Sequence, residues 1–146
     1  MAIQRADFPL PDPDDPLTAP FFGGAARGDL VVPRCDACGS YVWYPAPRCA
    51  ACGHDGITWV AVSGRGSLFS WAVVERAFLP AFADQVPFVS GLVALDEDPF
   101  VRIVTYVVDA EPAALVADQR VEVVFRALAF PTVPGRSVVV PMFRPV

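Results

Sequence analysis

The 146-residue sequence predicts a mainly β protein in three parts, and three observations support this. Residues 1–30 are rich in proline, residues 31–60 contain all four cysteines, and residues 61–146 alternate short apolar runs with turn-forming residues. Proline-rich chain is extended, paired cysteines form tight metal-binding turns, and short alternating runs form strands. We therefore expect a short N-terminal helical arm (1–30), a zinc ribbon (31–60) and a small closed barrel (61–146).

The first part of the arm combines prolines and aspartates, which favour an extended path without internal hydrogen bonds. Two interpretations remain open. The arm is a solvated tail, or it lies over another surface and uses Phe8, Leu10 and Leu17 as apolar anchors.

A short helix is expected near Pro20–Gly28. Thr18 can cap its start, Pro20 suits the first turn, and Gly28 suits the end. Gly23 and Gly24 lie in the middle of this segment and lower its helix propensity.

The cysteines occur as two C-x-x-C pairs that are ten residues apart, and glycine follows each pair at once. Two thiolates at this spacing bind one metal when the chain turns tightly, and the glycine provides the positive φ that such a turn needs. Two such turns complete a closed, structural site of four thiolates, for which we expect Zn²⁺. Iron in the same site and disulfide bonds are the alternatives. The expected ligands are Cys35, Cys38, Cys49 and Cys52.

From about residue 60 the chain shows five or six short strands and one small helical segment. The expected strands are Thr58–Val62, Ser67–Glu75, Phe88–Leu95, Phe100–Val108, Val121–Leu128 and Ser137–Phe143, with one or two helical turns in Glu111–Asp118. This number and order suit a closed barrel of the OB type, and a β-sandwich is the alternative. The turn Gly64-Arg65-Gly66 is too short to bind a dinucleotide and is expected to join two strands.

The charges argue against nucleic acid as a partner. The whole chain has 11 basic residues, all of them arginine, and 16 acidic residues, for a net charge of −5. Binding to a phosphate backbone usually requires a basic face, and none of the three parts has a net positive charge. No run without charged residues is long enough to span a membrane as a helix, and no apolar leader opens the sequence, so we expect a cytoplasmic protein.

The sequence offers no candidate catalytic residue. It has one histidine, His54, which follows the second cysteine pair and is expected to face solvent in a turn. No serine-nucleophile motif, zinc-protease motif or phosphate loop occurs. An enzyme that works on its own is therefore not expected.

Several motifs in order resemble the family called domain of unknown function 35. They begin with Thr18-Ala-Pro-Phe-Phe, Gly28-Asp-Leu and Arg34-Cys-x-x-Cys-Gly, and continue with Tyr44-Pro-Ala-Pro-Arg-Cys-x-x-Cys-Gly, Trp59-Val-Ala-Val-Ser-Gly-Arg-Gly, Pro80-Ala-Phe-Ala-Asp-Gln-Val-Pro-Phe and Pro141-Met-Phe-Arg-Pro. The resemblance covers residues from about 8 to the end. It implies an N-terminal helical arm, a rubredoxin-like zinc ribbon and a C-terminal OB fold, with the four cysteines as zinc ligands.

The resemblance also implies a role as a non-catalytic partner. Proteins of this family accompany thiolases of the sterol-carrier-protein type, aldolases, acyltransferases or hydratases that act on acyl-CoA, including enzymes of steroid side-chain degradation. We therefore expect a partner that is a thiolase-like homodimer, in an α2β2 complex with acyl-CoA at or near the interface. The alternatives are a free-standing module that binds acyl-CoA or lipid and, third, a module that binds single-stranded nucleic acid.

Three surfaces are candidates for these contacts. The ribbon and the arm residues Phe8, Leu10, Phe21 and Phe22 are expected to contact the partner. The loop Phe78–Phe88 shows no helix or strand pattern and is either an ordinary connection, a second contact or a lip over an acyl channel.

Arg65 and Arg76 flank the first strand of the barrel. They are candidates for binding a CoA phosphate, and exposed charges that aid solubility are the alternative.

Overall fold

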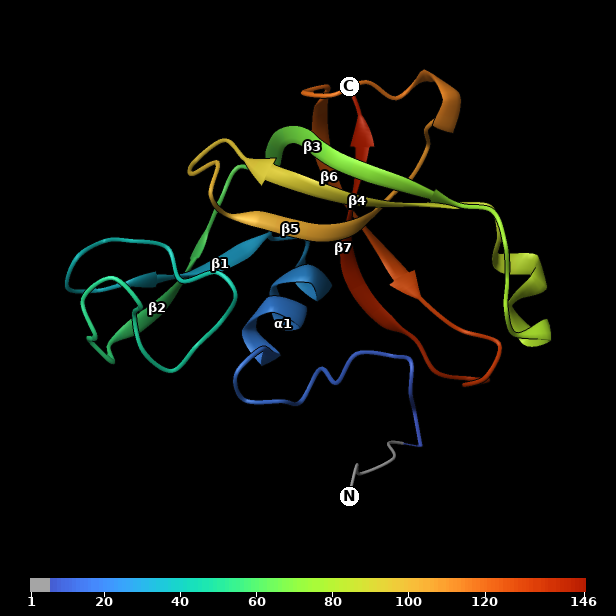
Figure 1. The fold of residues 1–146 in the computed structure, drawn as a ribbon. Helices are drawn as coiled ribbons and strands as arrows, with labels where there is room; N and C mark the ends of the chain where they lie inside the picture. The colour runs from blue at the N-terminus through green and yellow to red at the C-terminus, as the bar shows by residue number, and fades with distance from the viewer. Residues whose placement is uncertain (1–5) are drawn as a thin grey trace.

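The computed structural model describes residues 6–146, so the first five residues of the predicted arm lie outside the described part. The elements are α1 (Ala19–Arg27), β1 (Val31–Cys35), β2 (Ile57–Ala61), β3 (Arg65–Val74), the 3-10 helix η1 (Pro80–Gln85), β4 (Phe88–Leu95), β5 (Arg102–Val107), the 3-10 helix η2 (Pro112–Ala114), β6 (Arg120–Leu128) and β7 (Val138–Pro145). Figure 1 shows the β1–β2 ribbon on one side of α1 and the barrel on the other. The mainly β prediction is confirmed.

The barrel has five strands in the closed order β3-β4-β5-β7-β6. Neighbouring strands are antiparallel except β5 and β7, which are parallel and meet at Val107 and Phe143. Closure leaves no free sheet edge, and the order is that of an OB fold. The predicted barrel is confirmed, and the β-sandwich alternative is wrong.

The segment Gly64-Arg65-Gly66 packs closely against two neighbouring strands of the barrel. A Cβ on Gly66 would lie 2.4 Å from the carbonyl oxygen of Ala94 on β4, and one on Gly64 would lie 2.3 Å from Cγ1 of Val123 on β6. Gly64 also has a φ of +77°, which other residues rarely adopt. A strand-to-strand connection is present as predicted, but it ends at Gly64, because Arg65 and Gly66 already belong to β3.

The ribbon and the barrel share one hydrophobic core. Leu30 directly precedes β1 and Val32 lies in it. Both are buried in the same cluster as Leu68 and Phe143 of the barrel. The indole N–H of Trp43 donates a hydrogen bond of 2.8 Å to the carbonyl oxygen of Arg102 on β5. The ribbon is thus held against the barrel by packing and by a hydrogen bond.

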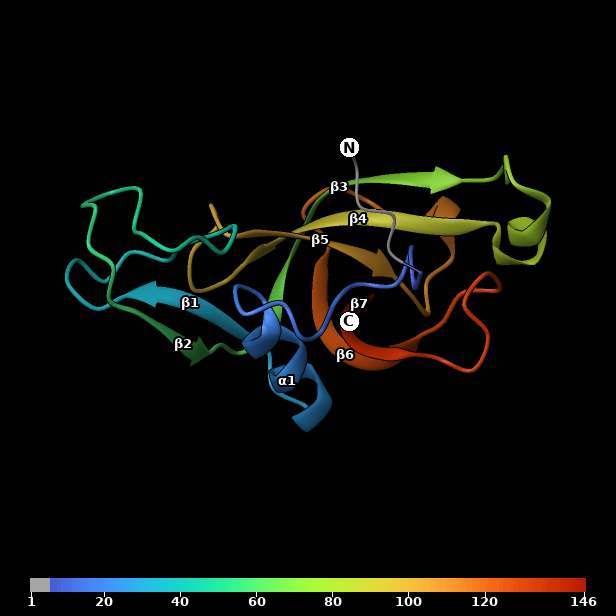
Figure 2. The ribbon, with the colours of Figure 1, turned by 90° about the horizontal axis from the view of Figure 1, so that it is seen from below.

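The arm packs on its own barrel. Leu10 is only 1% exposed and belongs to a second cluster with Val133, Val138, Val140 and Met142. Figure 2 shows the arm passing over β7. The solvated-tail interpretation is wrong for this segment, and Leu10 cannot be a contact for another protein because the barrel already covers it.

α1 ends where it was predicted to end. Gly28 has a φ of 83°, and its N–H donates to the carbonyl oxygen of Ala25. Thr18 stands at the N-cap position, but its side chain makes no cap hydrogen bond; the side-chain cap was a wrong expectation. In residues 6–146, no helix is long and apolar enough to cross a membrane.

The two glycines of α1 have different surroundings, and this gives a first prediction. A Cβ on Gly23 would meet only the flexible end of Arg27, at 3.5 Å, whereas one on Gly24 would lie 2.7 Å from Val31 and 2.9 Å from the carbonyl oxygen of Asp29. Gly23→Ala is expected to stabilise the protein by up to about 1 kcal/mol, because alanine favours helix. Gly24→Ala is expected to destabilise it by ~1–3 kcal/mol through overpacking.

The measurement is the free energy of unfolding in guanidinium chloride for the two variants and the parent. Equal effects of the two substitutions would contradict the packing of α1 against β1.

Candidate functional site

The four cysteines stand on two tight turns of the same form. The first turn follows β1, where the N–H of Gly39 donates to the carbonyl oxygen of Cys35 at 3.0 Å. In the second turn, the N–H of Gly53 donates to the carbonyl oxygen of Cys49 at 2.8 Å. Both glycines have a φ above +70°. The sequence C-x-x-C-G therefore folds into the turn that it predicts.

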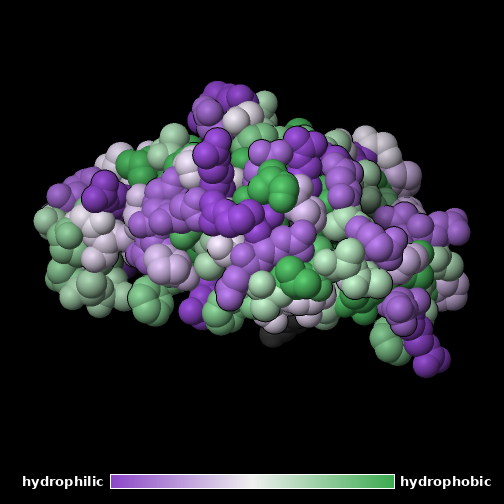
Figure 3. All heavy atoms as spheres, turned by 90° about the horizontal axis from the view of Figure 1, so that it is seen from above, coloured by the Kyte–Doolittle hydropathy of each residue, from purple (hydrophilic) through white to green (hydrophobic). Residues whose placement is uncertain are grey.

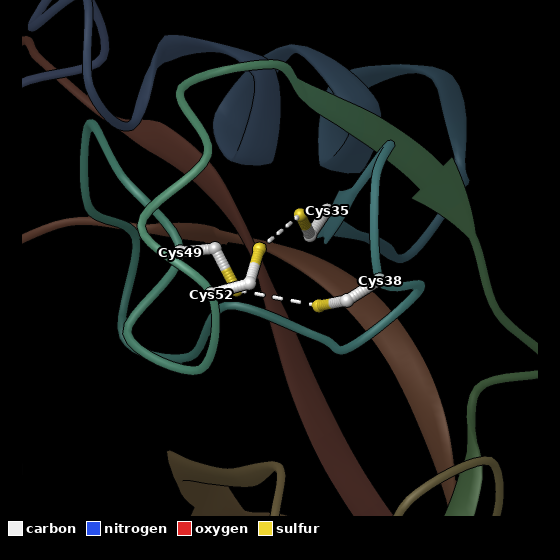
Figure 4. A group of neighbouring side chains, drawn as sticks. All are labelled: Cys35, Cys38, Cys49 and Cys52. Atoms are coloured by element: carbon white, nitrogen blue, oxygen red, sulfur yellow. Dashed lines mark hydrogen bonds between the residues drawn. The ribbon is translucent and has the colours of Figure 1, made fainter.

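The two turns bring the four sulfur atoms together (Figure 4). All four Sγ atoms lie within 4.8 Å of one another, with 3.6 Å between Cys35 and Cys52 and between Cys38 and Cys49. Zinc–sulfur bonds of ~2.3 Å in a tetrahedron require sulfur–sulfur separations of ~3.8 Å. The cysteines are free rather than bonded as disulfides, so the disulfide alternative is wrong and the geometry fits a tetrahedral metal ion.

The site is half shielded from water. Cys35 and Cys49, the first cysteine of each pair, are buried, whereas Cys38 and Cys52 are exposed. All four positions around the ion would be filled by protein sulfur, which leaves none for a substrate or water. An ion held in this way stabilises the structure and does not catalyse a reaction.

The surroundings of the cysteines stabilise the thiolate form of at least one of them before a metal binds. Hydrogen bonds from the side chain and then the backbone of Ser40 lower the pKa of Cys38 to about 6. The backbone N–H of His54 favours the thiolate of Cys52, but hydrogen bonds with the other thiols, together with burial, raise its pKa to about 12. A divalent cation at the centre of the four sulfurs would favour the thiolate form of each.

The other candidate residues lie apart from the metal site and from each other. His54 is exposed in the turn that follows Cys52, as expected. Arg65 and Arg76 are exposed near the two ends of β3, and at ~3.3 Å per residue they are separated by roughly 30 Å of strand. One phosphate group therefore cannot contact both arginines.

The structure also shows an apolar groove beside the loop for which the sequence had left open an ordinary connection, a second contact or a lip over an acyl channel. The loop Phe78–Phe88, which was expected to be irregular, contains η1 and forms one wall of a cavity of about 630 Å³. The connection between β6 and β7 forms the other wall, and the rings of Phe82 and Phe130 lie 6.0 Å apart where the two connections meet.

Two family models match this chain in consecutive segments. Residues 22–58 match the model described as "ChsH2, rubredoxin-like zinc ribbon domain". Residues 59–126 match the model described as "ChsH2, C-terminal OB-fold domain".

Two solved structures share the fold. A chain of the "Ltp2-ChsH2(DUF35) aldolase" is 30% identical with a TM-score of 0.77, over 92% of this chain and 98% of that chain. A protein of unknown function from the DUF35 family of Sulfolobus solfataricus is 13% identical with a TM-score of 0.59, over 90% of this chain and 86% of that one.

Two curated relatives are also similar. The "Probable enoyl-CoA hydratase alpha subunit" of Thermomonospora curvata is 35% identical over 92 residues, which are 63% of this chain and only 28% of that protein. The "DUF35 domain-containing scaffold protein" of Methanothermobacter thermautotrophicus is 29% identical over 101 residues, 68% of this chain and 74% of that protein. With its ribbon and its barrel both matched, and with 98% of the aldolase's ChsH2-type chain covered, this chain belongs to the DUF35/ChsH2 family.

Proposed function

We propose that this chain is a non-catalytic accessory subunit of a thiolase-like enzyme that acts on acyl-CoA. In this proposal the chain binds a homodimer of the enzyme as an α2β2 complex, stabilises it and helps to form its acyl-CoA site. The single observation that carries the proposal is the similarity to the ChsH2 chain of the Ltp2-ChsH2(DUF35) aldolase, which extends over nearly the full length of both chains.

The other relatives support the same class of function. One is named as a scaffold protein and one as a subunit of an enoyl-CoA hydratase, of which this chain spans 28%. We propose Zn²⁺ as the ion bound by Cys35, Cys38, Cys49 and Cys52, because four thiolates in a closed tetrahedron are typical of structural zinc.

The arginines of the barrel support a protein partner over a nucleic acid. Salt bridges join Arg120 to Asp96, Arg126 to Asp109, Arg144 to Glu122 and Arg136 to Asp7. Four of the seven arginines in residues 61–146 are therefore paired within the chain, which leaves Arg65, Arg76 and Arg102 without a salt bridge among the described residues.

We propose that the partner contacts the side of the molecule where the arm meets the ribbon. There, Leu17 of the arm, Ala46 of the ribbon and Trp59 of β2 line a shallow hollow of about 220 Å³. Leu17 is 42% exposed, and Tyr44 in the neighbouring ribbon loop is 61% exposed. By contrast, Figure 3 shows a broad hydrophilic band, with separate hydrophobic patches, on the face that is seen from above in the view of Figure 1.

The proposal is tested by co-expression with thiolase-like proteins from the same genome, starting with the product of the adjacent gene. Affinity purification of the tagged chain is expected to recover an untagged partner at a one-to-one ratio, and light scattering is expected to give the mass of an α2β2 complex. Recovery of this chain alone with every thiolase-like protein, each fully active by itself, would reject the accessory role.

A substitution on the proposed surface gives a sharper prediction. Leu17→Asp is expected to lower the amount of recovered partner at least tenfold, because it removes an exposed apolar side chain and adds a second carboxylate to a hollow that Asp55 already lines. Val116→Asp is the matched control, because Val116 is 59% exposed and lies between η2 and β6. This substitution is expected to leave recovery of the partner unchanged. Both variants should keep their metal, and equal recovery with both would place the interface elsewhere.

A further inference from the structure

The shallow hollow between the arm and the ribbon, which we call the arm–ribbon hollow, is lined by three separate segments. The β1–β2 pair contributes Pro33, Ile57 and Trp59. Pro33 and Trp59 lie directly opposite each other in this pair, and Ile57 and Trp59 share one face of β2 because they are two residues apart. Leu17 comes from the arm, and Ala46 comes from the ribbon loop before Cys49.

The arm–ribbon hollow has a rigid lining. Proline has a fixed φ and loses almost no side-chain entropy when it is buried. Four of the nine lining residues are prolines, namely Pro16, Pro33, Pro45 and Pro47. Pro33 is also less than 2% exposed, so the β1 side of the lining is held by the interior of the ribbon. An occupant therefore meets a preformed surface, and binding orders few groups.

The hollow carries one negative charge that is not compensated. Among the described residues, Asp55 is the one charged residue in the lining, and no arginine forms a salt bridge with it. Arg34 is near in the sequence, but its Nε donates to a backbone carbonyl of the first cysteine turn. The hollow itself is lined by none of the acidic or basic residues that adjoin the lining in the sequence, which are Asp15, Arg34, Arg48 and His54.

The size of the hollow restricts its occupant. Its volume of about 220 Å³ is below the ~300–1,000 Å³ that is typical of sites for drug-sized molecules. One side chain of another protein therefore suits the hollow better than a small molecule does. That side chain must combine an apolar stem, for the proline and isoleucine lining, with a positive charge for Asp55.

Arginine meets these requirements better than lysine. Its planar guanidinium can stack on the indole of Trp59 while two of its N–H groups donate to the carboxylate of Asp55. Lysine brings the same charge, but its ammonium neither stacks as a plane nor binds a carboxylate through a fixed pair of donors. Arginine is also among the residues that contribute most to binding when they enter a pocket at the centre of an interface.

We propose that the arm–ribbon hollow receives an arginine side chain of the thiolase-like partner, with its guanidinium bound to Asp55 and stacked on Trp59. The inference rests on the proposed function, which supplies the partner, and adds the chemistry of the contact. One guanidinium balances one carboxylate. The second carboxylate in Leu17→Asp would then be buried without a cation, in keeping with the weaker recovery expected of that variant.

The first test is the affinity of the full-length, metal-loaded chain for the separately purified partner, measured by isothermal titration. Asp55→Asn keeps the shape of the side chain and removes its charge, so we expect affinity to fall at least about tenfold. Asp118→Asn is the matched control. Asp118 is exposed between η2 and β6 and has no salt bridge among the described residues, so the control should change affinity less than about twofold.

Two substitutions of Trp59 test the stacking. Trp59→Phe keeps an aromatic face and should weaken binding less than about twofold, whereas Trp59→Leu keeps only apolar volume and should weaken it about fivefold. The metal content and melting temperature of both variants are measured, because Trp59 lies in the ribbon. Equal losses of affinity in the two variants would contradict a stacked guanidinium.

A charge exchange identifies the arginine. Asp55→Arg should reduce recovery of the partner by at least about a hundredfold, since like charges would meet in the interface. Each exposed arginine of the partner is then changed to aspartate in turn. One of these changes is expected to restore recovery at least about tenfold with Asp55→Arg and to lower it with the parent chain. Restoration at a lysine and at no arginine would overturn the inference.

The outcomes separate this inference from the accessory function. If the parent chain binds the partner and Asp55→Asn binds it equally tightly, the inference fails and the accessory function stands. If the parent chain binds no thiolase-like partner, both fail. A dimer of this chain that Asp55→Arg dissociates in sedimentation would also overturn the inference, because an arginine of a second copy would then fill the hollow.

Discussion

Cys35→Ser is expected to remove the metal from the protein and to unfold the ribbon. The buried cluster of the ribbon contains only Cys35, Val42 and Cys49, with Ala46 and Ile57 packed against it. Two of its three buried members are themselves sulfur ligands, so this cluster is too small to fold without the ion. Structural zinc sites bind with apparent free energies of about 10–16 kcal/mol, so we expect the metal to be the main source of the ribbon's stability.

Substituting a residue that hydrogen-bonds to a metal ligand typically lowers metal affinity ~10–100-fold. Loss of a ligand itself should lower the affinity further. We expect one metal ion per chain in the parent, and less than about a tenth of that in Cys35→Ser, by elemental analysis after dialysis. Hydrogen exchange should become fast at the amides of Cys35, Val42 and Cys49, whose hydrogen bonds hold the ribbon together.

His54→Ala is the matched control for this substitution. His54 follows the second C-x-x-C turn and is exposed, and its side chain is not one of the four ligands. We expect the His54→Ala protein to retain one metal ion per chain and the slow hydrogen exchange of the parent. A Cys35→Ser protein that lacks metal but keeps slow exchange throughout the ribbon would show that packing alone holds this part of the chain.

The barrel should survive the loss of the ribbon in part. Its cluster contains twelve buried residues, of which only Leu30 and Val32 belong to the ribbon side. We therefore expect Cys35→Ser to retain the far-ultraviolet signal of the barrel strands at a lower melting temperature. A chelator that removes the metal from the parent should give the same state.

The metal site and most barrel strands could be predicted from the sequence because their signals are local. The spacing C-x-x-C-G specifies its own turn, and the positive φ of Gly39 and Gly53 shows that glycine is needed there. The predicted strands lie within a few residues of the observed ones, since their alternation follows the period of a half-buried strand. The meeting of the two C-x-x-C pairs followed from the chemistry of a closed four-thiolate site.

The features that the sequence left open depend on contacts between distant segments. Leu10 is buried by residues of β7 and the connection before it, more than 120 residues away in the sequence. Gly24 was expected only to weaken the helix, but its small size makes room for Val31 and Asp29. The groove exists because Phe82 and Phe130 meet across two connections, and a pattern within either segment does not report such a meeting.

Phe143→Ala is expected to be the most destabilising substitution in the barrel. Phe143 is 0% exposed and lies on β7, where this strand closes the barrel against β5. It pairs with Val107 and Val123 on its two neighbouring strands, and its carbonyl oxygen accepts a hydrogen bond of 2.8 Å from Val108. Removing the ring from this position is expected to lower the free energy of unfolding by ~3–5 kcal/mol.

The measurement is the midpoint of unfolding in guanidinium chloride, with exchange at the amide of Val108 as the local readout of the β5–β7 seam. Phe100→Ala removes the same ring from an exposed turn and should change the free energy of unfolding by less than about 0.5 kcal/mol. Because Phe143 belongs to a different cluster from the cysteines, Phe143→Ala should keep its metal while it loses barrel stability, the reverse of Cys35→Ser. If both variants lost metal and barrel together, ribbon and barrel would unfold as one cooperative unit through Leu30 and Val32, and the metal would then stabilise the groove as well as the ribbon.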